Sequence, residues 1–206
     1  MLAPDTVSSS VALPKIKFLK QPTQQAWIDQ AIAHIDTVLL DHSHCERKAA
    51  GMALKLMFRY PSYECMVRSL TALAQEELEH FELCNQWLER RGIAMAPLAA
   101  PPYGATLNAQ IRRHEPDRFL DLMLVSALIE ARSHERLGLL AAHLPDPDLA
   151  QFYRGLMASE ARHYGIYWML AHTYCDQAQI VPRLAELAEV ESQVLATLHP
   201  EPRIHS

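Results

Sequence analysis

Two segments of the chain carry a glutamate three residues before a histidine, and this repeated spacing constrains the fold more than any other feature. The pairs are Glu77 with His80 in "QEELEHFE" and Glu160 with His163 in "SEARHYG". Residues three apart lie on the same face of a helix, so each pair can present a carboxylate and an imidazole to one point. The spacing alone is weakly informative, because a chain with many Glu and His residues produces it by chance.

A further glutamate lies at a matching depth before each pair. Glu46 precedes Glu77 by 31 residues, and Pro61 lies between them, 15 residues after the first and 16 before the second. Glu130 precedes Glu160 by 30 residues, on either side of the turn sequence "PDPD". At about 1.5 Å per residue, each glutamate lies roughly 20–24 Å from its turn. Two antiparallel helical hairpins of this kind bring the four carboxylates to one level of a bundle.

Four carboxylates and two imidazoles from four helices are the ligand set of a carboxylate-bridged di-iron or di-manganese centre. Apolar neighbours at helical spacing, such as Leu73 and Phe81 around Glu77, predict that these carboxylates are buried, where they resist ionising unless cations neutralise them. The alternative is that the glutamates face solvent and the histidines pack by chance. The predicted metal ligands are Glu46, Glu77, His80, Glu130, Glu160 and His163.

Other polar residues near these six are predicted to have lesser roles. His42 and His134 lie one helical turn from a predicted ligand and are either outer hydrogen-bonding partners or ordinary core and rim residues. Four more glutamates point off the ligand face and are expected to be solvated: Glu76, Glu79, Glu82 and Glu135.

Apolar residues recur at three- and four-residue spacing along most of the chain, and no stretch alternates as a strand does, which predicts an all-α fold. The prolines and glycines divide the chain into helices at 23–60 (broken or bent near 41–43), 62–91, 106–114, 117–144, 147–174 and 182–198, with a long connection at 93–116. The predicted organisation is an extended arm at 1–22, a di-metal four-helix bundle at 23–174 and a C-terminal helical extension at 175–206.

Composition narrows the class of protein. The chain has 206 residues, half of them hydrophobic, which is enough for one globular domain with a hydrophobic core. Its formal net charge is −5, so it lacks the overall positive charge typical of nucleic-acid-binding proteins. The 4 cysteines form no C-x-x-C pair, which excludes a rubredoxin-type iron site. The N-terminal stretch lacks the apolar run of a signal peptide, and no run is long enough to span a bilayer. We expect a cytoplasmic protein without membrane contact.

Three runs resemble a known family more closely than the ligand spacing alone. These are "LLDHSHCERKAAGMALKLMFRYP", "LIEARSHERLGLLAAHL" and "SEARHYGIYWMLA". They are similar to the bacterial tRNA hydroxylases that act on methylthio-isopentenyl adenosine beside the anticodon, which belong to the ferritin-like di-iron carboxylate proteins. The resemblance extends from about residue 18 to about residue 174 and includes residues that flank each predicted ligand. It implies a ferritin-like four-helix bundle with a long crossover between the two hairpins.

The resemblance also implies a reaction and its cofactors. All six predicted ligands match the family's metal-ligand positions, with Glu77 and Glu160 expected to bridge and Glu46 and Glu130 to be terminal. Two non-haem iron ions, dioxygen as co-substrate and electrons from a separate reductase would hydroxylate the isopentenyl group of the modified tRNA adenosine. An iron-handling ferroxidase and a manganese catalase are the alternatives.

Binding tRNA requires a basic surface on an acidic chain. The cations expected to form that surface are Lys15, Lys17, Lys20, Arg90, Arg91, Arg112 and Arg113. The expected partners are therefore tRNA and an electron-donor protein, and the expected oligomeric state is a monomer or a dimer.

Overall fold

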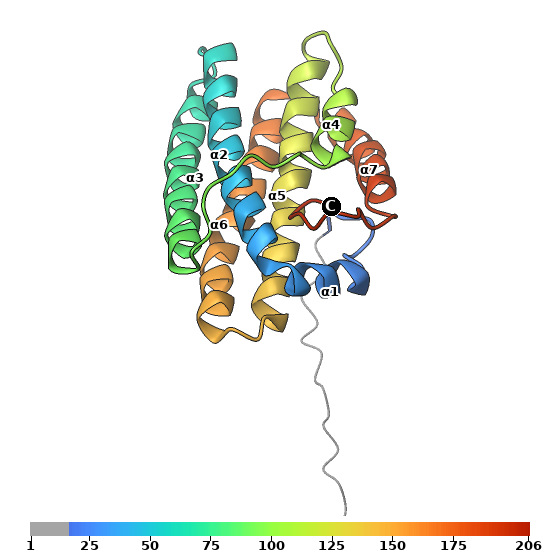
Figure 1. The fold of residues 1–206 in the computed structure, drawn as a ribbon. Coiled ribbons are helices and arrows are strands. Elements are labelled where there is room, and N and C mark those ends of the chain that lie inside the picture. The colour runs from blue at the N-terminus through green and yellow to red at the C-terminus, as the bar shows by residue number, and fades with distance from the viewer. Residues whose placement is uncertain (1–16) are drawn as a thin grey trace, which may run out of the picture.

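The structure is a computed structural model that describes residues 17–206, and the chain folds over that range into helices without a strand. Four long helices form the body of the molecule: α2 (Ile35–Arg59), α3 (Glu64–Arg90), α5 (Asp117–His143) and α6 (Pro147–Tyr174). Three shorter helices lie beside α5 (Figure 1): α1 (Gln25–Ala33), α4 (Pro102–Ala109) and α7 (Gln177–Val194). The all-α prediction is confirmed. Most of the predicted extended arm lies outside the described residues, and the predicted domain boundaries stay predictions.

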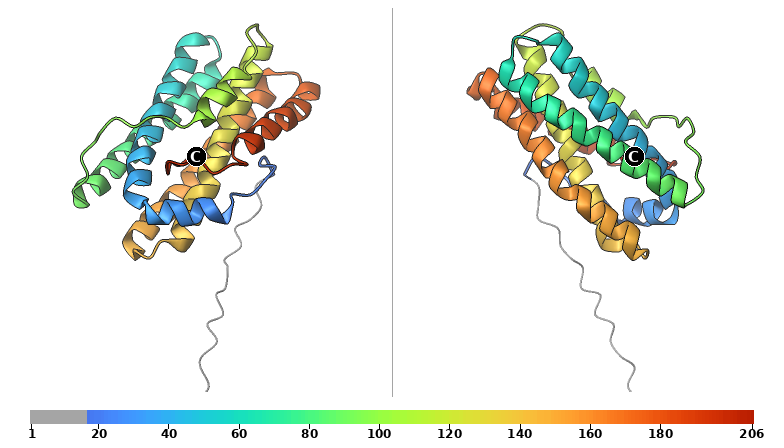
Figure 2. Two further views of the ribbon diagram at one scale, coloured as in Figure 1. Left: turned by 45° about the vertical axis from the view of Figure 1, so that its right-hand side comes forward. Right: turned by 90° about the vertical axis from the view of Figure 1, so that its left-hand side faces the viewer.

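The long helices form two antiparallel hairpins, α2 with α3 and α5 with α6, which pack along most of their length. The connection from 91 to 101 crosses the outside of the bundle from the end of α3 to α4 at the other end (Figure 1). Figure 2 shows the four long helices running side by side along a common axis. This crossover between two hairpins is the ferritin-like arrangement, as predicted. No helix among the described residues has the length and apolar content needed to span a membrane.

Local sequence explains where the long helices stop and start. Gly92, with φ 69°, follows α3, and the Ile93 and Gly92 amides donate to the carbonyls of Leu88 and Glu89 at 2.9 and 3.0 Å. This is a Schellman motif, in which a glycine in the left-handed region closes the helix. Asp146 begins α6 by accepting hydrogen bonds from the amides of Asp148 and Leu149. Both boundaries were predicted from these residues.

Three helix boundaries differ from the sequence prediction. The first helical stretch breaks at His34, whose φ is −127°, and α2 continues without a bend through 41–43. Helix α4 begins at Pro102, four residues before the predicted start, because a proline fits the first turn of a helix. Helix α7 begins at Gln177, where Asp176 accepts a hydrogen bond from the Ala178 amide, and Pro182 lies inside the helix instead of opening it.

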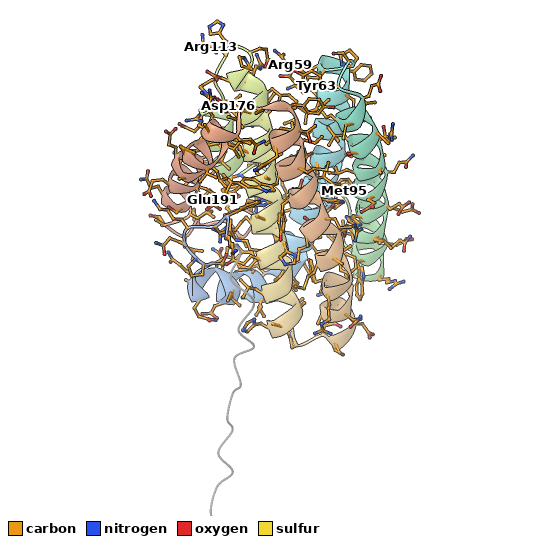
Figure 3. All side chains as sticks on the ribbon, turned by 180° about the vertical axis from the view of Figure 1, so that it is seen from behind. Arg59, Tyr63, Met95, Arg113, Asp176 and Glu191 are labelled. Atoms are coloured by element: carbon orange, nitrogen blue, oxygen red, sulfur yellow. The ribbon has the colours of Figure 1, made fainter. Side chains whose placement is uncertain are left out.

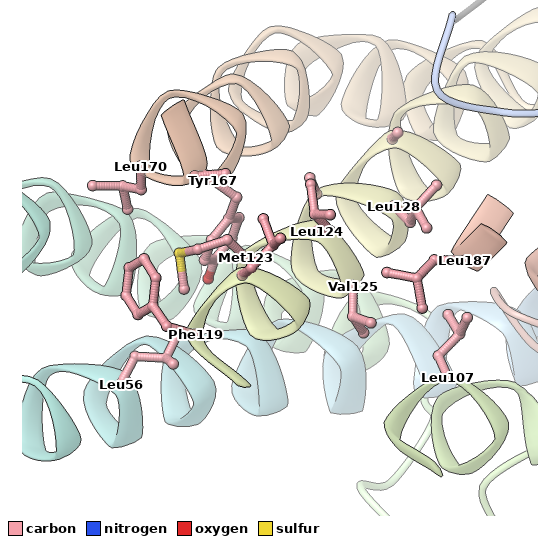
Figure 4. Close-up of a cluster of buried hydrophobic side chains, with 14 of the residues drawn as sticks. Leu56, Leu107, Phe119, Met123, Leu124, Val125, Leu128, Tyr167, Leu170 and Leu187 are labelled. Carbon is pink, nitrogen blue, oxygen red and sulfur yellow. The ribbon is translucent and has the colours of Figure 1, made fainter. Parts of the chain in front are cut away.

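Apolar side chains fill the bundle in two clusters, one towards each end. The first includes Leu56 on α2, Phe119 and Met123 on α5, and Tyr167 and Leu170 on α6 (Figure 4). The second, at the other end, includes Trp27, Leu39, Leu140 and Tyr153. On α2, α3 and α6 the predicted metal ligands lie between the residues of these two clusters, and on α5 Glu130 lies next to Ala131, the last residue of the first cluster. The bundle therefore surrounds a polar layer with hydrophobic core on both sides.

Candidate metal centre

Each long helix contributes to this polar layer, and the structure brings together all six residues predicted from the sequence. Helix α2 supplies Glu46 and α5 supplies Glu130, whereas α3 and α6 each supply a glutamate and a histidine. None of the six is more than 7% exposed. Their burial excludes the alternative in which the glutamates face solvent.

The six side chains form two overlapping groups, and within each group the potential ligand atoms all lie within 4.8 Å of one another. The first group contains Glu46 and His80, and the second contains Glu130 and His163. Glu77 and Glu160 belong to both groups. Each group offers four donor residues, and the two shared carboxylates are placed to bridge a pair of ions. The arrangement suits two metal ions better than one.

Unpaired polar atoms inside the layer test whether it fits metal ions. His163 Nδ1 lies 2.8 Å from Glu77 Oε1, and His80 Nδ1 lies 3.4 Å from Glu46 Oε2. All four atoms are buried, and none has a hydrogen-bond partner among the described residues, because the contacts are poorly aligned. Buried polar atoms without a partner are costly. A cation between these atoms removes that cost, so the donor set fits a metal centre.

The far nitrogen of each histidine is held by a residue outside the ligand set. His163 Nε2 donates to Glu76 Oε2 at 3.1 Å, and Arg162 also donates to that carboxylate. His80 Nε2 donates to Ser159 Oγ at 3.2 Å, because the Ser159 hydroxyl itself donates to the Leu156 carbonyl. These bonds place the proton on Nε2 of each ring and leave Nδ1 free to bind a cation.

Neither of these two partners is predicted from the sequence. Glu76 was predicted to be solvated, but the structure places it against His163. Glu135 was also predicted to be solvated, and it instead accepts hydrogen bonds from Thr23 and Arg132. Of the two outer histidines, His42 lies 2.5 Å from Glu46 through Nε2, whereas His134 contacts the Met157 carbonyl.

Electrostatics of the metal-free layer show why it needs cations. Burial, together with the nearby Glu77 carboxylate, raises the pKa of Glu130 to about 8. Burial and the Glu130 carboxylate also raise the pKa of Glu160. Burial lowers the pKa of His80, but Glu46 and Glu77 outweigh it and raise that pKa to about 9. Protons thus partly neutralise the carboxylates in the absence of metal, and cations can replace them.

The metal-free protein is expected to lose stability as the pH rises from about 5 to about 9. The folded-state pKa values of Glu130 and His80 are raised, to about 8 and about 9, so the folded layer holds protons that the unfolded chain releases earlier. Stability from such groups is complete below their unfolded pKa and is lost as the pH passes the folded pKa. Calorimetry across this range measures it. A metal-loaded sample should lose less stability over this pH range. Equal losses in the two samples would contradict the assignment of these residues as metal ligands.

An apolar cavity opens beside the layer. It has a volume of about 480 Å³, lies among α2, α4 and α5, and reaches Glu130 and Tyr167. The His205 ring lines the cavity and stacks on Tyr103, with ring centroids 4.8 Å apart and an interplanar angle of 13°. We call this cavity the Glu130 pocket; its apolar lining includes Ala49, Met52, Leu122, Val125 and Ile129. No feature of the sequence predicted it, because residues far apart in the chain form its walls.

Fold and site together define a ferritin-like protein with a buried carboxylate and imidazole centre suited to two metal ions. Residues 10–206 match the family described as tRNA-(MS[2]IO[6]A)-hydroxylase (MiaE), and the chain belongs to this family of enzymes. The family match favours a hydroxylase over the iron-handling and catalase alternatives.

Two curated relatives, which share one name, are similar to this chain over most of its length. The tRNA 2-(methylsulfanyl)-N(6)-isopentenyladenosine(37) hydroxylase of Pseudomonas putida is 41% identical over 94% of this chain and 95% of its own length. The protein of that name from Salmonella typhimurium is 31% identical, with coverage of 94% and 89%. A solved structure, described as "Protein 43 with aldehyde deformylating oxygenase activity from Synechococcus", is 49% identical, with a TM-score of 0.90 and coverage of 93% and 96%.

Proposed function

We propose that this chain hydroxylates the isopentenyl group of 2-methylthio-N6-isopentenyladenosine in tRNA, with two iron ions held by the six predicted ligands. The observation that carries the proposal is the Glu130 pocket, an apolar cavity that ends on one of those ligands. The pocket suits a short branched hydrocarbon group better than a charged substrate. The family membership and the 41% identity to the Pseudomonas putida hydroxylase support this substrate.

The chain itself has three tasks in this reaction. Bound iron would supply the activation of dioxygen that an unactivated C–H bond requires. The walls of the Glu130 pocket hold the isopentenyl group against Glu130 and exclude water from the reacting carbon. Glu76 and Ser159 fix the tautomers and orientations of His163 and His80. Glu77 and Glu160, the carboxylates common to both groups, would help to hold both ions.

Hydroxylation places one oxygen atom of dioxygen in the C–H bond and releases the other as water, which consumes two electrons and two protons. We propose that a separate reductase supplies the electrons, since the chain has no flavin or iron–sulfur motif. We also propose that the protein acts in the cytoplasm, where tRNA is found, as a monomer or a dimer.

Reconstitution tests the proposed function directly. Purified protein loaded with ferrous iron is incubated with dioxygen, a chemical reductant and tRNA that carries the isopentenylated adenosine, and the nucleosides are then analysed by mass spectrometry. We expect a gain of one oxygen atom on that nucleoside. An unchanged nucleoside with iron-loaded protein would contradict the proposal.

Filling the Glu130 pocket is expected to remove activity without removing metal. Ala49 lines the pocket, and an Ala49→Phe substitution places an aromatic ring in the space proposed for the isopentenyl group. We expect kcat/KM to fall by more than about 100-fold, since a lost apolar subsite together with a misplaced substrate costs several kcal/mol. Iron content should remain two ions per chain. The matched control is Ala72→Phe on the exposed face of α3, which should keep wild-type activity.

Aldehyde deformylation is a second candidate, favoured by the 49% identity to the Synechococcus protein that is described as having this activity. The Glu130 pocket could also hold an aliphatic chain, so the pocket alone does not separate the two reactions. The same reconstituted protein is therefore incubated with a medium-chain aldehyde, and formate is measured. Turnover of the aldehyde without turnover of the tRNA would replace the first candidate with the second.

A further inference from the structure

A second cavity of different character lies next to the Glu130 pocket. This cavity has a volume of about 200 Å³ and shares Met52, Asn108, Ile111 and Leu122 with the pocket. Its remaining lining contains five cationic side chains and no carboxylate: Lys55, Arg59, Arg112, Arg113 and Arg118. The two cavities are therefore neighbours: the Glu130 pocket is mainly apolar, although Asp41 and Lys48 also line it, and the second cavity is cationic. Figure 3 shows Arg59 and Arg113 at the same end of the bundle.

The outer face of α2 extends this cationic region. Residues 47–63 contain four cations, Arg47, Lys48, Lys55 and Arg59, and no aspartate or glutamate. The whole chain carries a formal charge of −5, whereas this stretch carries a positive net charge. Lys48 lines the Glu130 pocket itself. A solvated face usually mixes charges of both signs, whereas a surface of one sign raises the local concentration of an oppositely charged ligand.

Ion pairs show which of these cations are available to a ligand. Arg112 donates to Asp121 and also pairs with Asp117, and Arg59 pairs with Glu115 at 3.5 Å. These two arginines are therefore engaged within the chain. Five other cations have no carboxylate partner among the described residues: Arg47, Lys48, Lys55, Arg113 and Arg118. Of these, Arg47 contacts His44 Nδ1 at 3.0 Å. Arg118 Nε is also buried without a hydrogen-bond acceptor in that range.

An exposed aromatic side chain lies one helical turn from Lys55 on α2. Phe58 is 86% exposed and lies three residues after Lys55 on α2. Leu54, one turn earlier, is 44% exposed. An exposed phenylalanine lowers solubility without stabilising the fold. Proteins that bind single-stranded nucleic acid combine such aromatic rings with nearby cations. The ring stacks on an unpaired base while the cations contact phosphates.

We infer that Lys48, Lys55, Phe58, Arg113 and Arg118 form the surface that binds the anticodon loop on either side of the modified adenosine. This surface, the cationic lip, rests on the proposed function. RNA loops are recognised by stacking of unpaired bases on aromatic side chains and by phosphate contacts. Lys55 lies nine residues beyond Glu46 on α2, or about 13 Å along the helix. That separation lets the phosphates lie on the lip while the isopentenyl group reaches Glu130.

The cationic lip differs from the basic surface expected from sequence. Lys15 lies outside the described residues. Lys20 pairs with Glu189, and Arg91 pairs with Asp36. Arg90 and Arg91 end α3, at the opposite end of the bundle from Arg113 (Figures 1 and 3). Of the expected cations, only Arg113 belongs to the lip, because the surface combines α2 with the connection before α5 and the first turn of α5.

Charge reversal tests the inference in the full-length, iron-loaded protein. The variant is K55E/R113E, and the measurements are the Kd of a modified anticodon stem-loop, its salt dependence and the KM for that RNA. Each phosphate contact contributes about one to the slope of log K against log salt, so the slope should fall by about two and the Kd should rise by at least about tenfold. Phe58→Ala should raise the Kd by about tenfold without changing the slope.

Two controls separate a docking surface from general effects. The free nucleoside lacks phosphates, so its turnover should be unchanged in K55E/R113E. The matched variant R90E/R154E reverses two exposed arginines at the far end of the bundle and should bind RNA as the wild type does. A wild-type Kd and salt slope for K55E/R113E, or an equal loss in R90E/R154E, would overturn the inference. Failure of the proposed function gives a different result, which is no hydroxylation of either nucleoside or tRNA by the wild-type protein.

Discussion

Glu160→Gln is expected to bring the iron content to one ion per chain or fewer and to reduce hydroxylation by more than about 100-fold. Glu160 belongs to both groups of ligand atoms, so its loss weakens both metal positions. Even the outer partners of metal ligands are worth about 10–100-fold in affinity or activity, and a bridging ligand should be worth more. Metal analysis after gel filtration gives the iron content, and nucleoside turnover gives the activity.

The same substitution should leave the metal-free protein at least as stable as the wild type at neutral pH. Burial and the Glu130 carboxylate raise the pKa of Glu160 well above its ordinary value, so its buried charge is unfavourable without metal, and the neutral glutamine avoids that cost. The matched control is Glu79→Gln, an exposed residue beside His80, which should keep both ions. If Glu160→Gln retained two ions and full activity, the proposed bridging role would be wrong.

Arg132→Met is expected to cost about 3–5 kcal/mol in the free energy of unfolding, because it leaves a buried carboxylate without its cation. Arg132 and Glu191 are 1% and 0% exposed as side chains, and two hydrogen bonds of 2.7 and 2.9 Å join them. They attach α7 to α5. Tyr103 also donates to Glu191, at 3.2 Å, so the pair supports a wall of the Glu130 pocket.

Urea unfolding measures this loss. The double variant R132M/E191L removes both charges and should recover most of it, because well-packed apolar residues can replace a buried ion pair. A cost below about 1 kcal/mol for Arg132→Met would show that the pair is solvated and does not anchor α7.

The layer of predicted ligands could be located from sequence because it depends on regular geometry. Residues at equal distances from a turn lie at equal heights in an antiparallel hairpin, so Glu46 and Glu77 could be matched by counting from Pro61. Burial followed from the apolar residues at helical spacing around each glutamate. Neither argument needed contacts between distant segments.

Features that depend on contacts between distant segments were missed or wrong. The polar run at 41–43 resembles a helix break, but Asp41 accepts a hydrogen bond from the Ile204 amide, so the helix continues. Glu76 looks solvated in its own helix, and only the approach of α6 brings His163 to it. Pro182 resembles a helix start, whereas the Asp176 cap determines where α7 begins.

The cationic lip also bears on the choice between the two candidate reactions. A neutral aldehyde gains nothing from Lys55 or Arg113, whereas an anticodon loop does. If reversing the charge of a residue raises the KM for RNA but not for a phosphate-free substrate, that residue is specific to the tRNA reaction. Their effect on aldehyde turnover, measured in the same variants, should be small.

Anomalous diffraction at the iron edge, on crystals of the iron-loaded protein, tests the central claim most directly. We expect two peaks about 3.5–4 Å apart inside the bundle. Both should contact Glu77 and Glu160, one should contact His80 through Nδ1, and the other His163 through Nδ1. A single peak, peaks at the protein surface, or an iron-free layer with its carboxylates turned to solvent would contradict the account.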